Sequence, residues 1–447
     1  MLTISSASPV LHQPGHDLSP ALAWEGLLSD NFGDVFSAPS FKIFAALLTA
    51  WALCPGRRTL TRLWSVIPAW RRRCYSSYAR WVREGRWSMD ALWGRLVRLL
   101  VQHWAPADGR LTLLLDGTLV NKTGRKIDGA GFFYDSVTSA ALGFNVASWG
   151  LNVVVIALHV PAPWGGEPLA LPILVRLHRK DGQSLTALAV AMLRQLAEWL
   201  PDHRFRVVAD GGYASLIGCE LPRTVVITRL RRNAALYGLT PPRTGRRGRP
   251  RLRGERLPSP PELAAMASWE SVELDFRGRT IRRLLWARQV LWWETARART
   301  LLIVIVRDPA RLQPDQFFIT SDTSATPAEV VTGYAQRWPI EDTNRNAKQF
   351  LGIHNPQSWV GSGPERVVCL GFWLYSAIWH WYLTLSTPPS AWPHRPWYPG
   401  KRTPSFADAL ATLRRQLWTH AISDLGPLDR RLPQIHAMLL TVLAEAA

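Results

Sequence analysis

Apolar and polar positions divide the chain into a helical beginning, a strand-rich middle and a helical end. Between residues 40 and 104, apolar residues recur every three or four positions over three stretches, which predicts helices. Short apolar runs follow from about residue 110 and predict buried strands, with one helical stretch among them, QSLTALAVAMLRQLAEWL. Strands followed by alternating helix and strand predict an α/β fold, in which helices cover a mixed sheet.

A stretch rich in Pro, Gly and Arg interrupts this pattern between residues 238 and 262 and predicts a basic loop. Further strands are predicted after it in SVELDFRG, RTIRRLLWARQVLW, TLLIVIVRDP and FFITSD. Helical spacing returns from TPAEVVTGYAQRW onward, apart from a Pro- and Trp-rich loop at Pro388–Pro399. The second half of the chain is therefore expected to be a strand-rich insertion followed by helices.

One apolar stretch reaches the length of a membrane span. Val367–Leu385, VVCLGFWLYSAIWHWYLTL, runs for nineteen residues without Asp, Glu, Lys or Arg. The polar residues Ser376, His380 and Thr384 lie within it, and no second such segment accompanies it. We therefore favour a buried core helix over a membrane span and expect no membrane partner.

Composition narrows the class of protein. The 447 residues predict two or three domains, and a hydrophobic content of 47% with 19% charged residues excludes wholesale disorder. The net charge of +20 points to a polyanionic partner, DNA or RNA ahead of an anionic membrane. Four cysteines without a C-x2-C pair indicate neither a zinc ribbon nor a disulfide framework. No signal peptide is recognised in the first 30 residues, so a cytoplasmic protein is expected.

Arginines are concentrated in two segments. Nine arginines and one acid lie between Arg57 and Arg86, interleaved with Trp64, Trp70 and Trp81 and followed by Trp87, and the two short helices expected there resemble a helix-turn-helix module. A helical domain that binds only backbone phosphate is the alternative. In the basic loop, Gly248–Pro250 with flanking arginines resembles an AT-hook, although a plain phosphate-binding loop explains the same residues. The arginines expected to contact DNA are Arg71, Arg72, Arg73, Arg247, Arg249 and Arg251.

Three acids suggest a metal site. Asp116 lies inside the apolar run LLLDGT, and Asp210 ends the strand-like VVADGG. Each alone could cap a turn, but a buried carboxylate needs a cation or hydrogen-bond donors as a partner. Together with Glu341 on a later helix they form an oxygen-only set that suits Mg²⁺. Two such ions can promote phosphodiester cleavage.

The segment YAQRWPIEDTNRNAKQFLG places cations around the third acid. The chain has only six lysines, and one of them is Lys348, seven residues after Glu341. If Pro339 only kinks a continuous helix, Tyr334 and Arg337 lie on the same helix face as Glu341 and Lys348. If Pro339 starts a new helix, Glu341, Arg345 and Lys348 still lie on one face of that helix. The acid could ligate a metal while the cations hold phosphates.

The pattern Y-x2-R-x3-E-x6-K, formed by Tyr334, Arg337, Glu341 and Lys348, resembles the signature of bacterial insertion-sequence DDE transposases. The closest branch has a β-rich insertion before the catalytic Glu. LLLDGT and VVADGGY resemble the two Asp motifs of that family and occur in the right order. The resemblance covers about residues 40–385. It implies an RNase H-like catalytic core, with Asp116 on the first strand, Asp210 after the fourth and Glu341 on a late helix.

The resemblance also implies roles for these residues. Asp116, Asp210 and Glu341 would be catalytic and would bind two Mg²⁺ ions, for which Mn²⁺ is expected to substitute. Tyr334, Arg337 and Lys348 would contact DNA phosphates near the cleaved end, and Arg345 is expected to join them. A tryptophan of the insertion stacks on a flipped base in some relatives, for which the candidates here are Trp286, Trp292 and Trp293.

The activity implied is that of a transposase that binds terminal inverted repeats, cuts at the element ends and joins the 3′-OH to target double-stranded DNA. Two ends imply a homodimer in the synaptic complex, associated with the nucleoid when bound. The alternatives are a DNA-binding regulator or targeting factor with an inactive core, and a nuclease without strand transfer. The expected organisation is an irregular segment at 1–38, a helical DNA-binding domain at 39–105, an RNase H-like core at 106–237 and 316–385, a β-rich insertion at 238–315 with its basic loop at 243–256, and a helical C-terminal region at 386–447.

Overall fold

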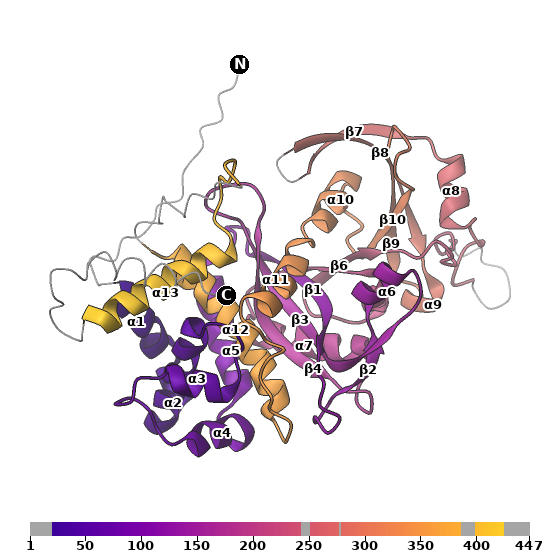
Figure 1. Ribbon diagram of the computed structural model, residues 1–447. Coiled ribbons are helices and arrows are strands. Elements are labelled where there is room, and N and C mark those ends of the chain that lie inside the picture. Colours follow the sequence, from indigo (N-terminus) through magenta and orange to yellow (C-terminus); the bar gives the residue numbers. More distant parts are fainter. Residues whose placement is uncertain (1–19, 243–250, 277–278, 386–397, 424–447) are drawn as a thin grey trace.

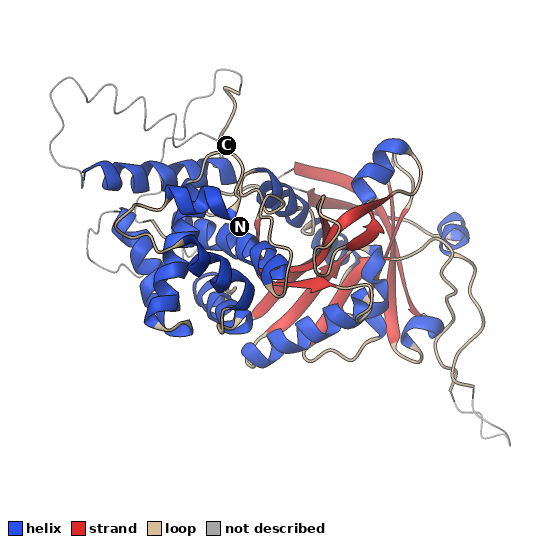
Figure 2. Cartoon of the chain, turned by 60° about the horizontal axis from the view of Figure 1, so that its bottom comes forward, coloured by secondary structure: helices blue, strands red, loops and turns tan. Residues whose placement is uncertain are grey.

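The computed structural model describes residues 20–242, 251–276, 279–385 and 398–423. Helices occupy one side of the molecule and a large sheet the other, so that the α/β class expected from the sequence is confirmed (Figures 1 and 2). The helical side contains α1 (Pro20–Phe32), η1 (Gly33–Val35), α2 (Ala38–Leu53), α3 (Leu60–Val66), α4 (Tyr75–Glu84), α5 (Met89–Trp104), α12 (Gly363–Leu383) and α13 (Phe406–Ser423).

The N-terminal helices differ from the expectation in three places. Residues 20–35 form α1 and η1, so the prediction of an irregular segment at 1–38 is wrong for these residues. Trp24, Leu28 and Phe32, spaced four apart, form the buried face of α1. The long helical stretch of residues 77–104 is broken into α4 and α5, and the hydroxyl of Ser88 caps the second of them. Residues 67–74 separate α3 from α4, and this connection is longer than the turn of about three or four residues in a helix-turn-helix module.

The described strands form one mixed sheet. Its strands in chain order are β1 (Arg110–Asn121), β2 (Gly131–Tyr134), β3 (Ala147–Val160), β4 (Leu169–His178), β5 (Arg204–Ala209), β6 (Thr224–Arg229), β7 (Glu270–Phe276), β8 (Arg279–Leu291), β9 (Thr300–Arg307) and β10 (Gln316–Thr320). Strands β4, β3 and β1 pair antiparallel, whereas β1, β5 and β6 pair parallel, which is consistent with an RNase H-like core.

The strands expected in the insertion form, and they extend the core sheet instead of building a sheet of their own. Strand β10 pairs antiparallel with both β6 and β9, and β8 and β7 follow β9 outward. An additional short strand, β2, pairs with β3 beside β4. Asp210 consequently follows the fifth strand of the chain. Without β2, which was not predicted, it follows the fourth, because β5 is preceded by β1, β3 and β4.

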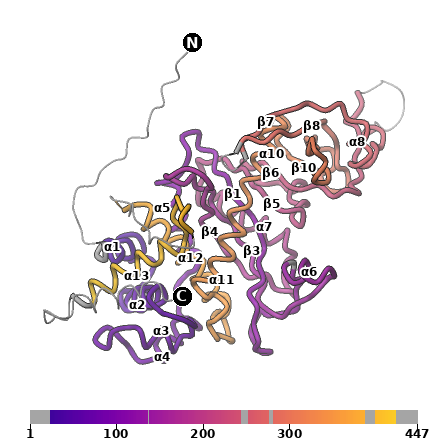
Figure 3. The backbone as a smooth tube through the Cα atoms, turned by 45° about the horizontal axis from the view of Figure 1, so that its top comes forward, coloured from indigo at the N-terminus to yellow at the C-terminus, as the bar shows by residue number. Residues whose placement is uncertain are grey.

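Five further helices, α6 (Ser136–Leu142), α7 (Leu185–Trp199), α8 (Pro260–Met266), α9 (Trp293–Ala296) and α10 (Pro327–Ala335), together with the 3₁₀ segment η2 (Gly211–Gly218) and helix α11 (Pro339–Gln349), accompany the sheet. Helix α7 packs against β3, β4 and η2, and α11 packs against β1 and β4. In Figure 3, α11 lies between the helical side and the strands. This position brings residues from late in the chain onto the first strand.

The apolar stretch Val367–Leu385 lies in α12, whose side chains are buried almost throughout. The helix packs against β4, α4, α5 and α13, and Trp373 and Trp379 belong to the large core. No helix in the described parts of the chain is long and apolar enough to cross a membrane. The expectation of a buried core helix is therefore confirmed.

Candidate active site

Two parallel strands place Asp116 beside Asp210. Leu115 of β1 is paired with Ala209, the last residue of β5, so the next residue on each strand is one of the two acids. Asp210 caps η2 by accepting a hydrogen bond from the backbone N–H of Gly212. The hydroxyl of Thr228 on β6 donates to the carbonyl oxygen of Asp210 at 2.9 Å and ties the turn to the next strand.

Helix α11 supplies Glu341. Helix α10 ends at Ala335 and α11 begins at Pro339, so the proline starts a new helix and does not kink a continuous one. Proline has no backbone N–H to continue the preceding helix but fits the first position of the next. Arg337 lies in the turn between the two helices, where its N–H donates to the carbonyl of Tyr334 at 3.0 Å.

Arg337 links two of the acids. Its guanidinium forms an ion pair with the carboxylate of Glu341, and its Nη1 lies 3.9 Å from Oδ1 of Asp116. Asn344, one turn after Glu341, donates from Nδ2 to Oδ2 of Asp116 at 3.0 Å. The carboxylate on β1 is therefore held from two directions by residues of one short segment.

The acids lie close enough to change each other's titration. Burial raises the pKa of Asp116 to about 6; Arg337 opposes this rise, and the negative charges of Asp210 and Glu341 add to it. Burial, followed by the charges of Asp116 and Asp210, also raises the pKa of Tyr213. These directions agree with the strand pairing that sets Asp116 beside Asp210 and with the position of Arg337 between Asp116 and Glu341.

Polar atoms without partners gather at the same place. Tyr213 Oη, Arg337 Nε and Asn344 Oδ1 are buried and have no hydrogen-bond partner among the residues that the structure describes. Three carboxylates, a hydroxyl and an amide oxygen are hard donors of the kind that Mg²⁺ prefers, so these residue types would fit such an ion. Within the described ranges no three Asp, Glu, His or Cys side chains are arranged as a metal-binding group, and Arg337 provides the positive charge between Asp116 and Glu341.

The structure brings the remaining residues of the Y-x2-R-x3-E-x6-K pattern to this site in different ways. The ring of Tyr334 packs 4.6 Å from that of Phe318 and lies under the guanidinium of Arg337. Burial lowers the pKa of Lys348, while the charges of Asp135 and Asp116 act in the opposite direction. Arg345 is exposed and pairs with Asp342 at 2.6 Å.

The other predicted DNA contacts lie elsewhere. Arg71, Arg72 and Arg73 occupy the connection between α3 and α4, where Arg71 pairs with Glu25 and Arg72 lies over the ring of Trp64. Arg247, Arg249 and the AT-hook-like Gly248–Pro250 fall outside the described residues, whereas Arg251 is exposed.

The three candidate stacking tryptophans also differ in exposure. Trp292 is buried, with 7% of its surface exposed, and Trp286 packs partly buried against the large core. The ring of Trp293 lies 5.3 Å from the guanidinium of Arg253. A buried ring has no free face for a base, so Trp292 is the least suited of the three in this conformation.

Sequence reasoning missed Asn344 and Tyr213. Asn344 is three residues after Glu341, a spacing that places both on neighbouring positions of one helix face, and this was the available signal. Tyr213 belongs to the VVADGGY motif, but its approach to Asp116 depends on the pairing of β1 with β5. No pattern along the chain reveals that pairing.

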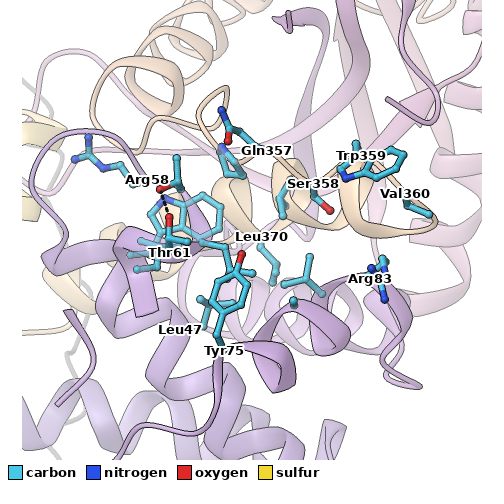
Figure 4. Close-up of a pocket in the computed structure, with 18 residues that line it drawn as sticks. Leu47, Arg58, Thr61, Tyr75, Arg83, Gln357, Ser358, Trp359, Val360 and Leu370 are labelled. Atoms are coloured by element: carbon cyan, nitrogen blue, oxygen red, sulfur yellow. Dashed lines mark hydrogen bonds between the residues drawn. The ribbon is translucent and has the colours of Figure 1, made fainter. Parts of the chain in front are cut away.

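A cavity of about 330 Å³ lies away from the acids, between the N-terminal helices and the segment Pro356–Val360. Figure 4 shows Tyr75 and Leu370 in its middle, with Thr61 and Arg83 toward opposite ends. None of the three acids lines it. The cavity is lined both by residues of the N-terminal helices and by residues of the chain that follows α11.

A family model described as DDE superfamily endonuclease matches residues 31–299, which is more than half of the chain. The chain belongs to this family. Membership in the DDE superfamily implies a DNA substrate and an endonuclease that generally uses a divalent cation such as Mg²⁺. No curated protein matches the chain.

The match of this DDE endonuclease to its family covers only part of the candidate site. Residues 31–299 include Asp116 on β1 and Asp210 at the start of η2. They end before α11, so the assignment of Glu341 depends on its ion pair with Arg337 and its effect on the pKa of Asp116.

Proposed function

We propose that this DDE endonuclease is the transposase of a bacterial insertion sequence. It would bind the terminal inverted repeats, cut at the element ends and join the freed 3′-OH to target DNA. The observation that supports the proposal is geometric: Asp116 and Asp210 come directly after the paired residues Leu115 and Ala209, and Arg337 pairs with Glu341 while its Nη1 lies 3.9 Å from Oδ1 of Asp116. Acids crowded in this way are stabilised by a bound cation.

The three carboxylates are the residues that would hold two Mg²⁺ ions, with Mn²⁺ able to substitute. When bound, these ions supply Lewis-acid activation of a water or hydroxyl nucleophile and neutralise charge on the phosphate. Asn344 holds the carboxylate of Asp116 in place through its hydrogen bond at 3.0 Å. Arg337 must leave Glu341 in part when the cations bind, and its guanidinium is then free to bind a phosphate beside the acids.

The cations around the acids would bind the DNA. Lys348 lies on the helix of Glu341 and can reach a phosphate as a flexible point charge. Tyr334, Arg345, the arginines at 71–73 and the basic loop would extend the contact along the duplex, and the net charge of +20 suits a protein that holds two ends and a target. Two ends imply a homodimer, active on bacterial DNA in the cytoplasm.

The test is cleavage of a labelled duplex that carries the element end, taken from the DNA that flanks the gene. Wild type with Mg²⁺ should cut at the end. Glu341→Gln should bind equally well but cut at least about 100-fold more slowly, because it keeps its shape and loses the charge that holds the metal. Glu198→Gln, an exposed acid on α7, is the matched control and should cut like wild type.

Other outcomes of this test would indicate other functions. If wild type binds the end but cuts with neither Mg²⁺ nor Mn²⁺, the chain is a DNA-binding regulator or targeting factor with an inactive core. The pairing of Arg337 with Glu341 is the observation that favours this second candidate, since it already supplies a cation to the acids. Cutting without joining to target DNA would instead indicate a nuclease that lacks strand transfer.

A further inference from the structure

The segment that joins β1 to β3 carries three exposed aromatic rings. Phe132, Tyr134 and Phe144 are 58%, 63% and 62% exposed, although each is a large apolar side chain. Val137 and Leu142 on the short helix α6 between them are exposed as well. Single exposed apolar residues are common, but five within thirteen residues mark a binding surface. We refer to residues 131–144 as the β2–α6 segment.

Strand register places two of these rings, those of Phe132 and Tyr134, on the same face of the sheet as Asp116. Asp116 is paired with Val155 of β3, and residues two apart on β3 point to the same face as Val155, down to Trp149 and Ala147. Phe132 is paired with Trp149 and Tyr134 with Ala147. The rings of Phe132 and Trp149 meet edge to face at 5.2 Å. Six residues of strand separate Val155 from Trp149, so the rings begin about 20 Å from the acid.

Helix α11 leads from the acids toward the same segment. Glu341 is near its start and Lys348 near its end. The chain that follows the helix reaches the connection between β1 and β2, where Nζ of Lys122 donates to the carbonyls of His354 at 2.9 Å and Pro356 at 3.0 Å. Asp135 caps α6 by accepting from the N–H of Thr138 at 3.0 Å and from the hydroxyl of Ser148 at 2.8 Å. A strand that lies across the acids and follows α11 is therefore directed toward the β2–α6 segment.

The charges around the rings favour a polyanion. Lys122, Arg125 and Lys126 precede β2, and the latter two are exposed. The nearby acids are engaged within the protein: Asp128 pairs with Arg179, and Asp135 accepts the hydrogen bonds that cap α6. Aromatic rings interspersed with unneutralised cations are typical of surfaces that bind nucleic acid strands through base stacking and phosphate contacts.

We propose that the β2–α6 segment binds unpaired nucleotides of the DNA held in the active site, with Phe132, Tyr134 and Phe144 stacking on their bases. This inference rests on the proposed function. The bases must be unpaired and displaced because neighbouring base pairs cover both faces of a base inside a duplex. A separation of about 20 Å corresponds to roughly six nucleotides, so the opened bases lie about that far from the cleavage point. These rings are distinct from Trp286, Trp292 and Trp293 of the insertion.

The experiment compares the binding of two duplexes by fluorescence anisotropy, in Ca²⁺ to prevent cleavage. Both carry the element end, and one has mismatches at positions four to eight from the cleavage point. Wild type should bind the mismatched duplex about 5- to 100-fold more tightly, the range expected from stacking on one or two bases. The variant F132A/Y134A/F144A should lose this preference and bind the paired duplex as wild type does, because its phosphate contacts remain.

Two further variants keep the result interpretable. F132Y/Y134F/F144Y retains three rings and should keep the preference, which separates stacking from damage to the fold. Tyr398→Ala removes an exposed tyrosine from another part of the chain and should change nothing. The fluorescence of 2-aminopurine at position six, which stacking quenches in the duplex, should rise when wild type displaces this base from paired DNA and should stay unchanged with the alanine variant.

Contrary outcomes overturn the inference separately from the proposed function. If wild type cuts the element end but binds both duplexes equally, the transposase assignment stands and the stacking surface is wrong. If the alanine variant keeps the preference and sediments as a smaller assembly than wild type, the rings form an interface between two copies of the chain. If wild type binds neither duplex, both proposals fail.

Discussion

Replacing Asp116 with asparagine should stabilise this DDE endonuclease in EDTA. Burial, opposed by Arg337 and reinforced by Asp210 and Glu341, raises the pKa of Asp116 from 3.8 to about 6. Between these two pH values the native state holds a proton that the unfolded chain has released. The free energy of unfolding therefore falls as pH rises from about 4 to about 6, and the loss persists above that range.

The size of the effect follows from the same two values. A pKa of about 6 in place of 3.8 corresponds to roughly 3 kcal/mol of stability lost at pH 8. The side chain of Asp116 is only 17% exposed, so solvent screens this cost little. Asparagine keeps an oxygen that can accept the hydrogen bond from Asn344 and carries no charge to bury. We expect a gain of about 1 to 3 kcal/mol at pH 8 that shrinks to about 1 kcal/mol or less at pH 4.5.

Urea denaturation followed by tryptophan fluorescence measures the difference at both pH values. The matched control Asp202→Asn changes an exposed aspartate and should stay within about 0.5 kcal/mol of wild type. Adding Mg²⁺ at pH 8 should stabilise wild type more than Asp116→Asn, since only wild type keeps all three carboxylates. If Asp116→Asn is less stable than wild type at pH 8, or if its gain is the same at pH 4.5, the acids do not crowd one another and the reasoning is wrong.

Three further predictions concern other parts of the molecule. Burial lowers the pKa of His380 to about 3, so the unfolded state binds a proton below pH 6.5 that the native state does not. From pH 7.5 to 5 the free energy of unfolding of wild type should therefore fall by roughly 2 kcal/mol more than that of His380→Gln, whose side-chain carbonyl can still accept from Trp104. Equal losses in the two proteins would contradict this. Arg366→Lys should lower the free energy of unfolding by about 2 to 4 kcal/mol in the same denaturation assay, because the guanidinium donates to several carbonyls between α4 and α5, including that of Gly85 at 2.8 Å. An unchanged midpoint would show that these hydrogen bonds do not stabilise the protein. Tyr213→Phe should leave the free energy of unfolding unchanged, because Oη has no partner in the described structure. The same change should slow cleavage about 10-fold. An unaltered rate would exclude the hydroxyl from the reaction.

Local sequence patterns predicted most of the individual elements. Strand β1, helix α7 and the strands after the basic loop were predicted from apolar runs and helical spacing, because these patterns record which side of an element is buried. The same patterns failed where a short segment depends on a partner. Strand β2 has only four residues, and its conformation depends on pairing with β3.

The acids were found in the sequence because charge is rare inside apolar strands, which made Asp116 and Asp210 conspicuous. Their grouping with Glu341 was an expectation from the chemistry of three carboxylates and from the resemblance, since the acids are separated by long stretches of chain. Whether distant residues meet depends on strand order and helix packing. The sequence shows these only through a known relative.

Tertiary structure alone decided how the site is built. Pairing of β1 with β5 sets Asp116 beside Asp210, and packing of α11 on β1 brings Asn344 to the same carboxylate and sets Arg337 between Asp116 and Glu341. Pairing of β10 with β6 joins the insertion to the core sheet. Periodicity along a chain reports the environment of each residue, whereas these contacts arise from hydrogen bonds and packing between residues far apart in sequence. The amino-acid sequence therefore determined which acids and cations this protein carries, and only the folded chain determined which of them act together.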